Sequence, residues 1–373
     1  YENVIIKGMT DGMVNREGTY FNWDEAMFRT GIYQNNDLSV SGGNENSRYY
    51  TSLSYTKDKN RVVINEYERI SGRINLTQKV ASFLESGTNI TLSHNLQEGY
   101  NDTRNLGGNY YLQSRNLLWP LYWPTDYKTG QPFTSRYGSY AYNPVYHENE
   151  WDNGSKITRL NATQSLSARL FESLVLKTIF SYESNNVKDH IYYSSNHYNG
   201  VTSVGSISEM STVYNKMVTS NTANYNKKFG EHGIDILAGF EAEKNKTDYQ
   251  RSTGTNLPST AVPTVATAGE RDANAYSWGY NLMSYLSRVE YSFANKYNLS
   301  ASFRRDGTSR LSPKVRWGNF WSVGASWTLS EENFLKDVDW INNIRVKASH
   351  GINGTVPSSN FGWRNLVSYG SRY

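Results

Sequence analysis

The chain of 373 residues contains no cysteine, which excludes disulfide scaffolds and cysteine-based zinc or redox sites. Its 38 Lys and Arg nearly balance 34 Asp and Glu, so the net charge of +4 gives no support to nucleic-acid binding. A mean hydropathy of −0.69 argues against a helical membrane protein. Its 30 Tyr, 13 Phe and 10 Trp argue against disorder and favour β structure with polar connections.

Residues 1–36 differ from the rest of the chain, because they show no regular alternation. The run Asn22-Trp-Asp-Glu-Ala-Met-Phe-Arg29 predicts a short helix, with the side chain of Asn22 as its N-cap. This helix would lie just before the first strand.

From residue 37 onward, apolar and polar residues alternate with a period of two, which is typical of β-strands with two different faces. In residues 159–170, for example, Leu160, Ala162 and Leu166 alternate with charged, amide and hydroxyl side chains. The pattern predicts about twelve strands, at 37–43, 47–56, 68–77, 84–95, 157–169, 173–184, 213–226, 232–244, 279–294, 296–305, 319–330 and 343–350.

The lengths of strands and connections favour a membrane barrel over a soluble sandwich. Many predicted strands have ten residues or more, and a tilted strand crosses a bilayer with about 9–11. The connections alternate between short and long, as do the periplasmic turns and extracellular loops of outer-membrane barrels. The long connections are predicted at 57–67, 96–156, 185–212, 245–278 and 306–318.

In such a barrel the apolar face meets lipid and the polar face lines a wet or plugged lumen. Six aromatic residues near strand ends are candidates for girdles at the membrane interfaces: Tyr55, Tyr67, Tyr182, Trp278, Tyr297 and Trp327. Ordinary cross-strand packing is the alternative explanation.

Several segments resemble the SusC/RagA family of TonB-dependent outer-membrane transporters of Bacteroidetes. The run Gln34-Asn-Asn-Asp-Leu-Ser-Val-Ser-Gly-Gly43 is similar to a first barrel strand of that family. The most specific likeness is Tyr297-Asn-Leu-Ser-Ala-Ser-Phe-Arg-Arg-Asp-Gly-Thr-Ser-Arg310, followed by Arg316-Trp-Gly-Asn-Phe-Trp-Ser-Val-Gly-Ala-Ser-Trp327. Trp23-Asp-Glu-Ala-Met-Phe-Arg-Thr30 resembles the segment just ahead of the barrel.

The resemblance implies an all-β fold, a transmembrane antiparallel β-barrel. The whole barrel would have about 22 strands, of which this chain would supply about twelve. Residues 1–36 would link the plug to the barrel, and residues 37–373 would form the N-terminal half of the barrel. The plug domain itself is not visible in this chain.

The resemblance further implies active import of an oligosaccharide or a peptide through the bacterial outer membrane, with the loops extracellular. The implied partners are TonB, acting through the plug, and a SusD-like surface lipoprotein that serves as a lid. Two alternatives stay open at this point. One is a siderophore or vitamin receptor of the same architecture, and the other is a passive channel or adhesin barrel.

The sequence shows no motif of an enzyme, a cofactor site or a metal site. There is no G-x-S-x-G elbow, no phosphate-binding loop and no H-E-x-x-H spacing. The six histidines are interpreted as solvated loop residues. We therefore expect no catalysis, no cofactor and no metal.

The connection 96–156 is the best candidate for ligand binding, because aromatic rings stack on sugars or cover peptide side chains. The candidate contact residues are Tyr110, Tyr111, Trp119, Trp123, Arg136, Tyr140 and Trp151. Two alternatives are that these rings pack the loop onto itself and that they contact a partner protein.

The arginine-rich stretch 304–310 has a simpler interpretation than an anion site. We expect its arginines to pair with Asp306 and neighbouring carboxylates, holding a strand-to-loop junction. Other charges on the polar faces of the strands, such as Arg159, Arg288 and Glu290, would face the plug.

Overall fold

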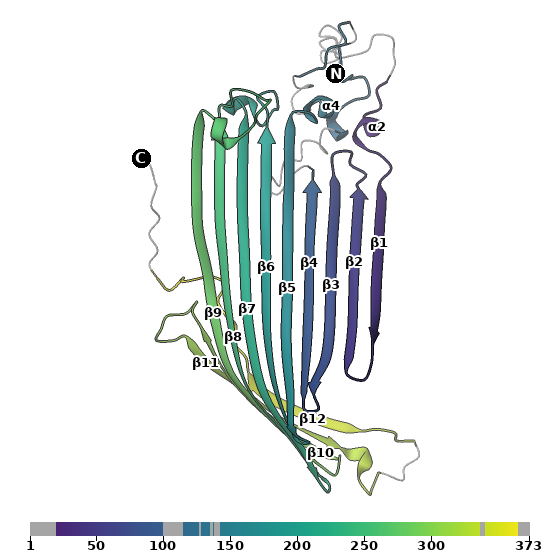
Figure 1. Cartoon of the computed structure of the whole chain (residues 1–373), viewed down its shortest axis with the longest axis vertical. Helices are drawn as coiled ribbons and strands as arrows, with labels where there is room; N and C mark the ends of the chain where they lie inside the picture. Colours follow the sequence, from purple (N-terminus) through teal and green to yellow (C-terminus); the bar gives the residue numbers. More distant parts are fainter. Residues whose placement is uncertain are drawn as a thin grey trace.

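A computed structural model describes residues 20–99, 115–126, 128–134, 137, 142–335 and 340–364. It contains one sheet of twelve strands, in which each strand pairs antiparallel with its neighbours in sequence (Figure 1). Beyond β9 the sheet curves strongly, so that β10, β11 and β12 turn away from the plane of the earlier strands. The twelve predicted strands and their order are confirmed.

The strands are β1 (Ile32–Gly43), β2 (Ser47–Lys59), β3 (Glu66–Ala81), β4 (Leu84–Glu98), β5 (Trp151–Phe171), β6 (Leu174–Tyr193), β7 (Ser206–Phe229), β8 (His232–Thr255), β9 (Glu270–Phe293), β10 (Tyr297–Thr308), β11 (Trp317–Thr328) and β12 (Arg345–Ile352). The α-helices are α2 (Trp23–Met27) and α4 (Pro144–His147), and the 3-10 helices are η1 (Val201–Ser203), η2 (Val265–Thr267) and η3 (Leu329–Glu331). No helix among the described residues is long and apolar enough to cross a membrane.

The strands extend further than predicted, mostly at the end opposite the short turns, here called the long-connection end. Strand β1 starts at Ile32, ahead of the predicted start at residue 37. The predicted connection 185–212 shrinks to 194–205, and the predicted connection 245–278 shrinks to 256–269, because β6 to β9 continue into both. The connection predicted at 96–156 spans 99–150.

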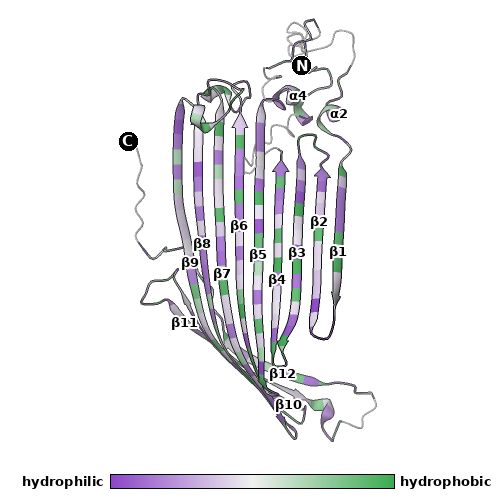
Figure 2. Cartoon of the chain, in the orientation of Figure 1, coloured by the Kyte–Doolittle hydropathy of each residue, from purple (hydrophilic) through white to green (hydrophobic). Residues whose placement is uncertain are grey.

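One face of the sheet carries an apolar band, and the strand register defines it. In β9 this face presents Met283, Tyr285 and Val289, which lie beside Ala242, Phe240 and Ile236 of β8. The band occupies residues 283–293 of β9, close to the 9–11 residues that cross a bilayer. Nearer the long-connection end the strands are mostly hydrophilic (Figure 2), and there the register places Lys244, Lys246 and Asp248 of β8 on this same face.

Two of the predicted girdle residues lie together on the apolar face, next to the short turns. Tyr297 and Trp327 are cross-strand partners whose ring centroids are 6.2 Å apart. Both donate to Glu332 Oε1, the Tyr297 hydroxyl at 2.5 Å and Trp327 Nε1 at 3.0 Å. The girdle prediction is wrong for Tyr67 and Trp278, because strand alternation places both on the polar face.

The predicted helix before the first strand is confirmed as α2. The side chain of Asn22 accepts hydrogen bonds from the backbone N–H groups of Asp24 at 3.1 Å and Glu25 at 3.3 Å. These bonds satisfy two donors that the first helical turn leaves free. At its other end the helix gives way to extended backbone at Phe28, which leads into β1.

The buried apolar clusters of the described residues lie at the long-connection end, beyond the apolar band. One consists of Trp23, Leu118, Tyr122 and Tyr137, which join the segment before β1 to the β4–β5 connection. The other consists of Tyr192, Ile207, Leu257 and Ala268, which join the connections on either side of β7 and β8. These clusters order the connections that surround the entrance to the polar face.

Candidate functional site

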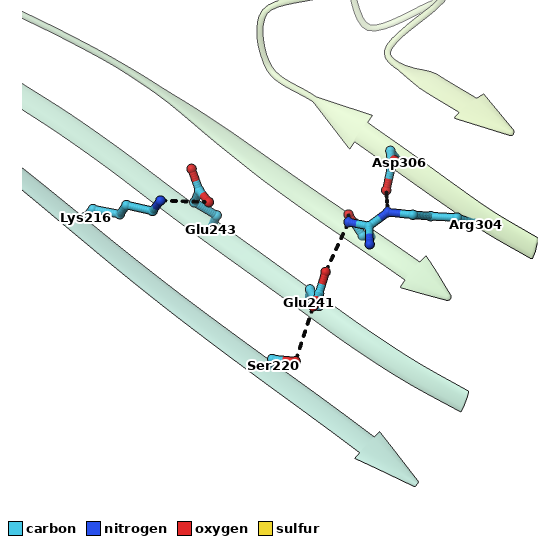
Figure 3. A network of polar contacts seen from close by, with 7 residues as sticks. Lys216, Ser220, Glu241, Glu243, Arg304 and Asp306 are labelled. Atoms are coloured by element: carbon cyan, nitrogen blue, oxygen red, sulfur yellow. Dashed lines mark hydrogen bonds and ion pairs between the residues drawn. The ribbon is translucent and has the colours of Figure 1, made fainter. Parts of the chain in front are cut away.

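The polar face of β7 to β10 holds a hydrogen-bonded network centred on Arg304 (Figure 3). Its guanidinium donates from Nε to Asp306 Oδ1 at 2.7 Å and from one terminal nitrogen to Glu241 Oε2 and Ser284 Oγ, both at 3.0 Å. Ser220 Oγ donates to the other oxygen of Glu241 at 3.3 Å. The network therefore links four strands, and the predicted pairing of Arg304 with Asp306 and a neighbouring carboxylate is confirmed.

Further ion pairs lie on the same face. Lys216 Nζ is 3.5 Å from Glu243 Oε2, one step from the Arg304 network towards the long-connection end (Figure 3). Towards the short turns, the guanidinium of Arg288 is 3.7 Å from Asp235 and 3.3 Å from Glu290. These side chains remain partly exposed, so the polar face stays hydrated and its pairs can exchange with water or with a docked segment.

Replacing Arg304 measures how much the network contributes to stability. We expect Arg304→Met to lower the free energy of unfolding by about 1 kcal/mol, because exposed ion pairs are individually weak. Urea unfolding at low and high salt measures this, and the loss should shrink at high salt. Arg305→Met is the matched control, since Arg305 lies on the opposite face over the Trp317 ring. An equal and salt-independent loss in both variants would contradict the assigned role.

Two of the predicted ligand-contact residues, Trp119 and Trp123, lie against the apolar cluster of α2 and the β4–β5 connection. The backbone carbonyl of Trp119 accepts from Trp23 Nε1 at 3.3 Å, and its ring stacks on Tyr122 at 6.2 Å. Trp123 packs on Phe21 at 5.5 Å. Trp151 lies apart from them at the start of β5, paired with Tyr193 of β6. Tyr110, Tyr111, Arg136 and Tyr140 lie outside the described residues.

The segment before β1 is fastened to the β4–β5 connection by polar contacts as well. Arg115 Nε is 2.7 Å from Asp24 Oδ1 in α2, and the pairing lowers the pKa of that carboxyl group. The backbone N–H of Phe21 donates to the carbonyl of Pro120 at 2.8 Å. A displacement of the chain ahead of β1 would therefore also displace this connection.

Asn143 is the polar centre of the connection and is fully buried. Its Nδ2 donates to the carbonyls of Pro124 at 2.8 Å and Phe133 at 3.0 Å. Its Oδ1 accepts from the backbone N–H of Tyr146 at 3.3 Å and so caps α4. One side chain thus joins three parts of the connection.

An aromatic–histidine junction joins the β4–β5 and β6–β7 connections, and it consists of Tyr142, Tyr146, His147, Tyr193, His197 and Tyr198. The His147 and His197 ring centroids are 5.1 Å apart, and Tyr142 stacks on Tyr198 at 4.1 Å. Exposure is only 4% for His147 and 1% for His197. Desolvation lowers the pKa of His147 to about 4 and that of His197 to about 3, where the charge of His147 adds to the effect.

The interpretation of the histidines as solvated loop residues is wrong for this pair. Both stretches, 142–146 and 192–198, are rich in aromatic residues, which is the feature of the sequence that hints at a packed junction. Only tertiary contact brings the two stretches together. The described residues contain no group of three or more His, Asp or Glu side chains arranged to hold a metal ion.

The comparisons with known proteins agree with this architecture. No family model matches the chain. TonB-dependent receptor SusC of Bacteroides thetaiotaomicron is 26% identical over 358 residues, which cover 89% of this chain and 34% of SusC. TonB-dependent receptor P39 of Formosa agariphila is 26% identical over 341 residues, which cover 90% of this chain and 32% of that relative. Over most of its length the chain is therefore similar to TonB-dependent receptors of the SusC/RagA family.

Two solved structures share this fold. The RagAB peptide importer in its "open-open" state superimposes with a TM-score of 0.79 at 21% identity, covering 95% of this chain and 40% of that one. Its "closed-closed" state gives a TM-score of 0.77 at 22% identity, covering 94% and 40%. The chain spans about a third of the length of the curated relatives it matches.

The likeness to TonB-dependent receptors explains the apolar band and the polar face. TonB-dependent receptors are outer-membrane β-barrel proteins that act as transporters rather than enzymes. In such a barrel the apolar band of β5 to β9 faces lipid, and the polar face with the Arg304 network lines the lumen.

Proposed function

We propose that this receptor actively imports an oligosaccharide or a peptide across the outer membrane, driven by TonB. The supporting observation is the polar face of β7 to β10, which carries a series of partly exposed ion pairs behind the apolar band. A wall of this kind stays wet and lets polar cargo pass. Residues 1–36 would join a plug to the barrel, and residues 37–373 would supply the N-terminal half of the barrel.

The proposed mechanism exposes a lumen site alternately to the two sides of the membrane. TonB, energised from the inner membrane, would pull on the plug, and the plug would release the weak pairs it makes with the lumen wall. Because exposed ion pairs contribute less than about 1 kcal/mol each, water can replace them as the plug moves. The plug could therefore move along this polar wall more easily than along an apolar interface.

At the long-connection end we propose an extracellular entrance covered by a SusD-like lipoprotein. The described residues of the β4–β5 connection support this proposal, because the aromatic cluster and Asn143 hold them in a fixed arrangement. Tyr110, Tyr111, Trp119, Trp123, Arg136, Tyr140 and Trp151 remain the proposed contact residues for cargo.

Uptake measurements test the proposal. Cells that express the complete receptor and its lid lipoprotein should accumulate labelled oligosaccharides or peptides only when TonB is present. Equal uptake without TonB would indicate a passive channel instead. Accumulation of only a ferric chelate or a corrin would indicate a siderophore or vitamin receptor.

A further inference from the structure

Strand β9 extends well past its neighbour β10 at the long-connection end. Strand β10 pairs with residues 282–293 of β9, and the last pair is Thr308 with Leu282. Strand β8, on the other side, pairs with β9 all the way to Glu270. Within the described parts of the chain, no strand therefore covers the outer edge of residues 270–280. This edge is bordered by the chain's own β10, unlike the terminal edges of β1 and β12.

Strand alternation identifies the backbone groups that point out from this edge. The N–H of Asn281 donates to Ser309 Oγ at 2.9 Å, and its carbonyl accepts from the N–H of Ser309 at 3.0 Å. Both groups of Asn281 thus face the β10 side. In an antiparallel strand every second residue points the same way, which assigns five more residues to the edge: Arg271, Ala273, Ala275, Ser277 and Gly279.

The edge has little of the protection that usually keeps an open strand unpaired. Proteins block such edges with proline, lysine, a bulge or a covering loop. Here the register with β8 runs without a bulge, and the edge residues from 273 to 279 are only alanine, serine and glycine. The one charged member, Arg271, turns back to donate to the Ala266 carbonyl at 3.4 Å.

Aromatic side chains line the lumen side of the same stretch. Tyr276 and Trp278 are 53% and 39% exposed, and their rings stack at 5.3 Å. At the foot of the edge, the Arg310 guanidinium lies 3.7 Å from the centre of the Tyr280 ring. Its Nε donates to Asn360 Oδ1 at 2.7 Å. The contacts of Arg310 therefore bound the edge at its lower end, and exposed aromatic rings lie beside it.

We propose that the upper edge of β9, residues 271–279, binds an extended peptide cargo by strand addition. The proposal rests on the proposed import function and narrows its cargo at this site to peptides. Only a polypeptide offers N–H and C=O groups at the spacing of about 3.3 Å per residue that the edge requires, and a saccharide does not. Tyr276 and Trp278 would cover every second side chain of the added strand.

Binding measurements on the complete receptor test the strand addition. The probe is a fluorescent pool of synthetic peptides of about eight residues, long enough to span the edge. Ser277→Pro removes one edge donor without touching the β8 pairing and should weaken binding about tenfold. Ser277→Ala keeps the donor and should bind within about twofold of the original. Peptides N-methylated at every residue have no N–H group to donate to the edge and should bind to neither form.

Amide exchange on the same receptor separates the possible occupants. With peptide added, the amides of Ala273, Ala275, Ser277 and Gly279 should gain protection. Protection already complete without peptide would overturn the proposal, because another part of the receptor or its lid would then fill the edge. Equal peptide binding by both Ser277 variants would also overturn it. TonB-dependent uptake by the unmodified receptor is scored separately, so import can stand while strand addition fails.

Discussion

Acidification from pH 7 to pH 5 should open the aromatic–histidine junction between the β4–β5 and β6–β7 connections. In the folded junction the pKa values of His147 and His197 lie at about 4 and about 3, below the ordinary value of 6.5. Because these pKa values are lowered, the folded junction favours neutral imidazole rings, and protonation of the rings favours the open form. The stabilisation is complete above pH 6.5 and falls as the pH drops towards 4, by about 1.4 kcal/mol per pH unit for each histidine.

Amide exchange across residues 194–205, followed as a function of pH, measures this opening. The partners that face the junction are tyrosine rings and Glu150, which accepts from Asn196 Nδ2 at 3.3 Å and from Ser194 Oγ.

A variant of His147 sharpens the test. Both ring nitrogens of His147 are buried without a hydrogen-bond partner, so His147→Phe keeps the ring packing and removes one titrating group. The pH dependence of opening should then fall to about half, since His197 alone remains. His190→Gln is the control, because His190 lies in β6 beside Glu209, away from the junction. An unchanged slope in His147→Phe would refute the assignment.

Replacing Asn143 with alanine should unfold the β4–β5 connection while the sheet persists. The change removes the donor from the partly buried Phe133 carbonyl and one of two donors from the Pro124 carbonyl, which keeps the Phe133 N–H, at about 1–3 kcal/mol together. It also removes the cap of α4, at about 1 kcal/mol. Limited proteolysis of residues 115–150 in the folded receptor should detect the loss. We expect cleavage there while the barrel stays resistant.

Asn143→Asp separates the two roles of this side chain. Aspartate keeps an oxygen for the Tyr146 N–H but has no donor for the carbonyls of Pro124 and Phe133. It should therefore protect α4 yet still expose residues 120–135 to protease. Resistance equal to that of the original chain would show that water replaces the two donors.

The strand pattern was predictable where the two faces of the sheet differ chemically. Inside the apolar band every second residue must suit lipid, so Leu160, Ala162 and Leu166 could be assigned to one face from sequence alone. Above the band both faces meet water and the alternation fades. The alternation therefore does not predict the extensions of β6 to β9, and the girdle prediction fails for Trp278.

The candidate sites were harder to predict, for a different reason. Asn143, His147 and His197 gain their roles from burial by residues far away in sequence, and nothing local distinguishes them from solvated loop residues. The free edge of β9 depends on the length difference between β9 and β10. Strand β9 starts nine residues before its predicted start, and β10 ends three residues after its predicted end.

The upper halves of β6 to β9 have a consequence for the cost of capturing cargo. A receptor whose entrance is made of flexible loops must order them upon each binding event, at about 1–2 kcal/mol per residue for the backbone. Here the wall above the bilayer is continuous hydrogen-bonded strand, and its shape is set before any molecule arrives. A cargo bound at this rim, as proposed, would meet strands that are already ordered by folding. Binding would therefore not lose the backbone entropy that flexible loops lose.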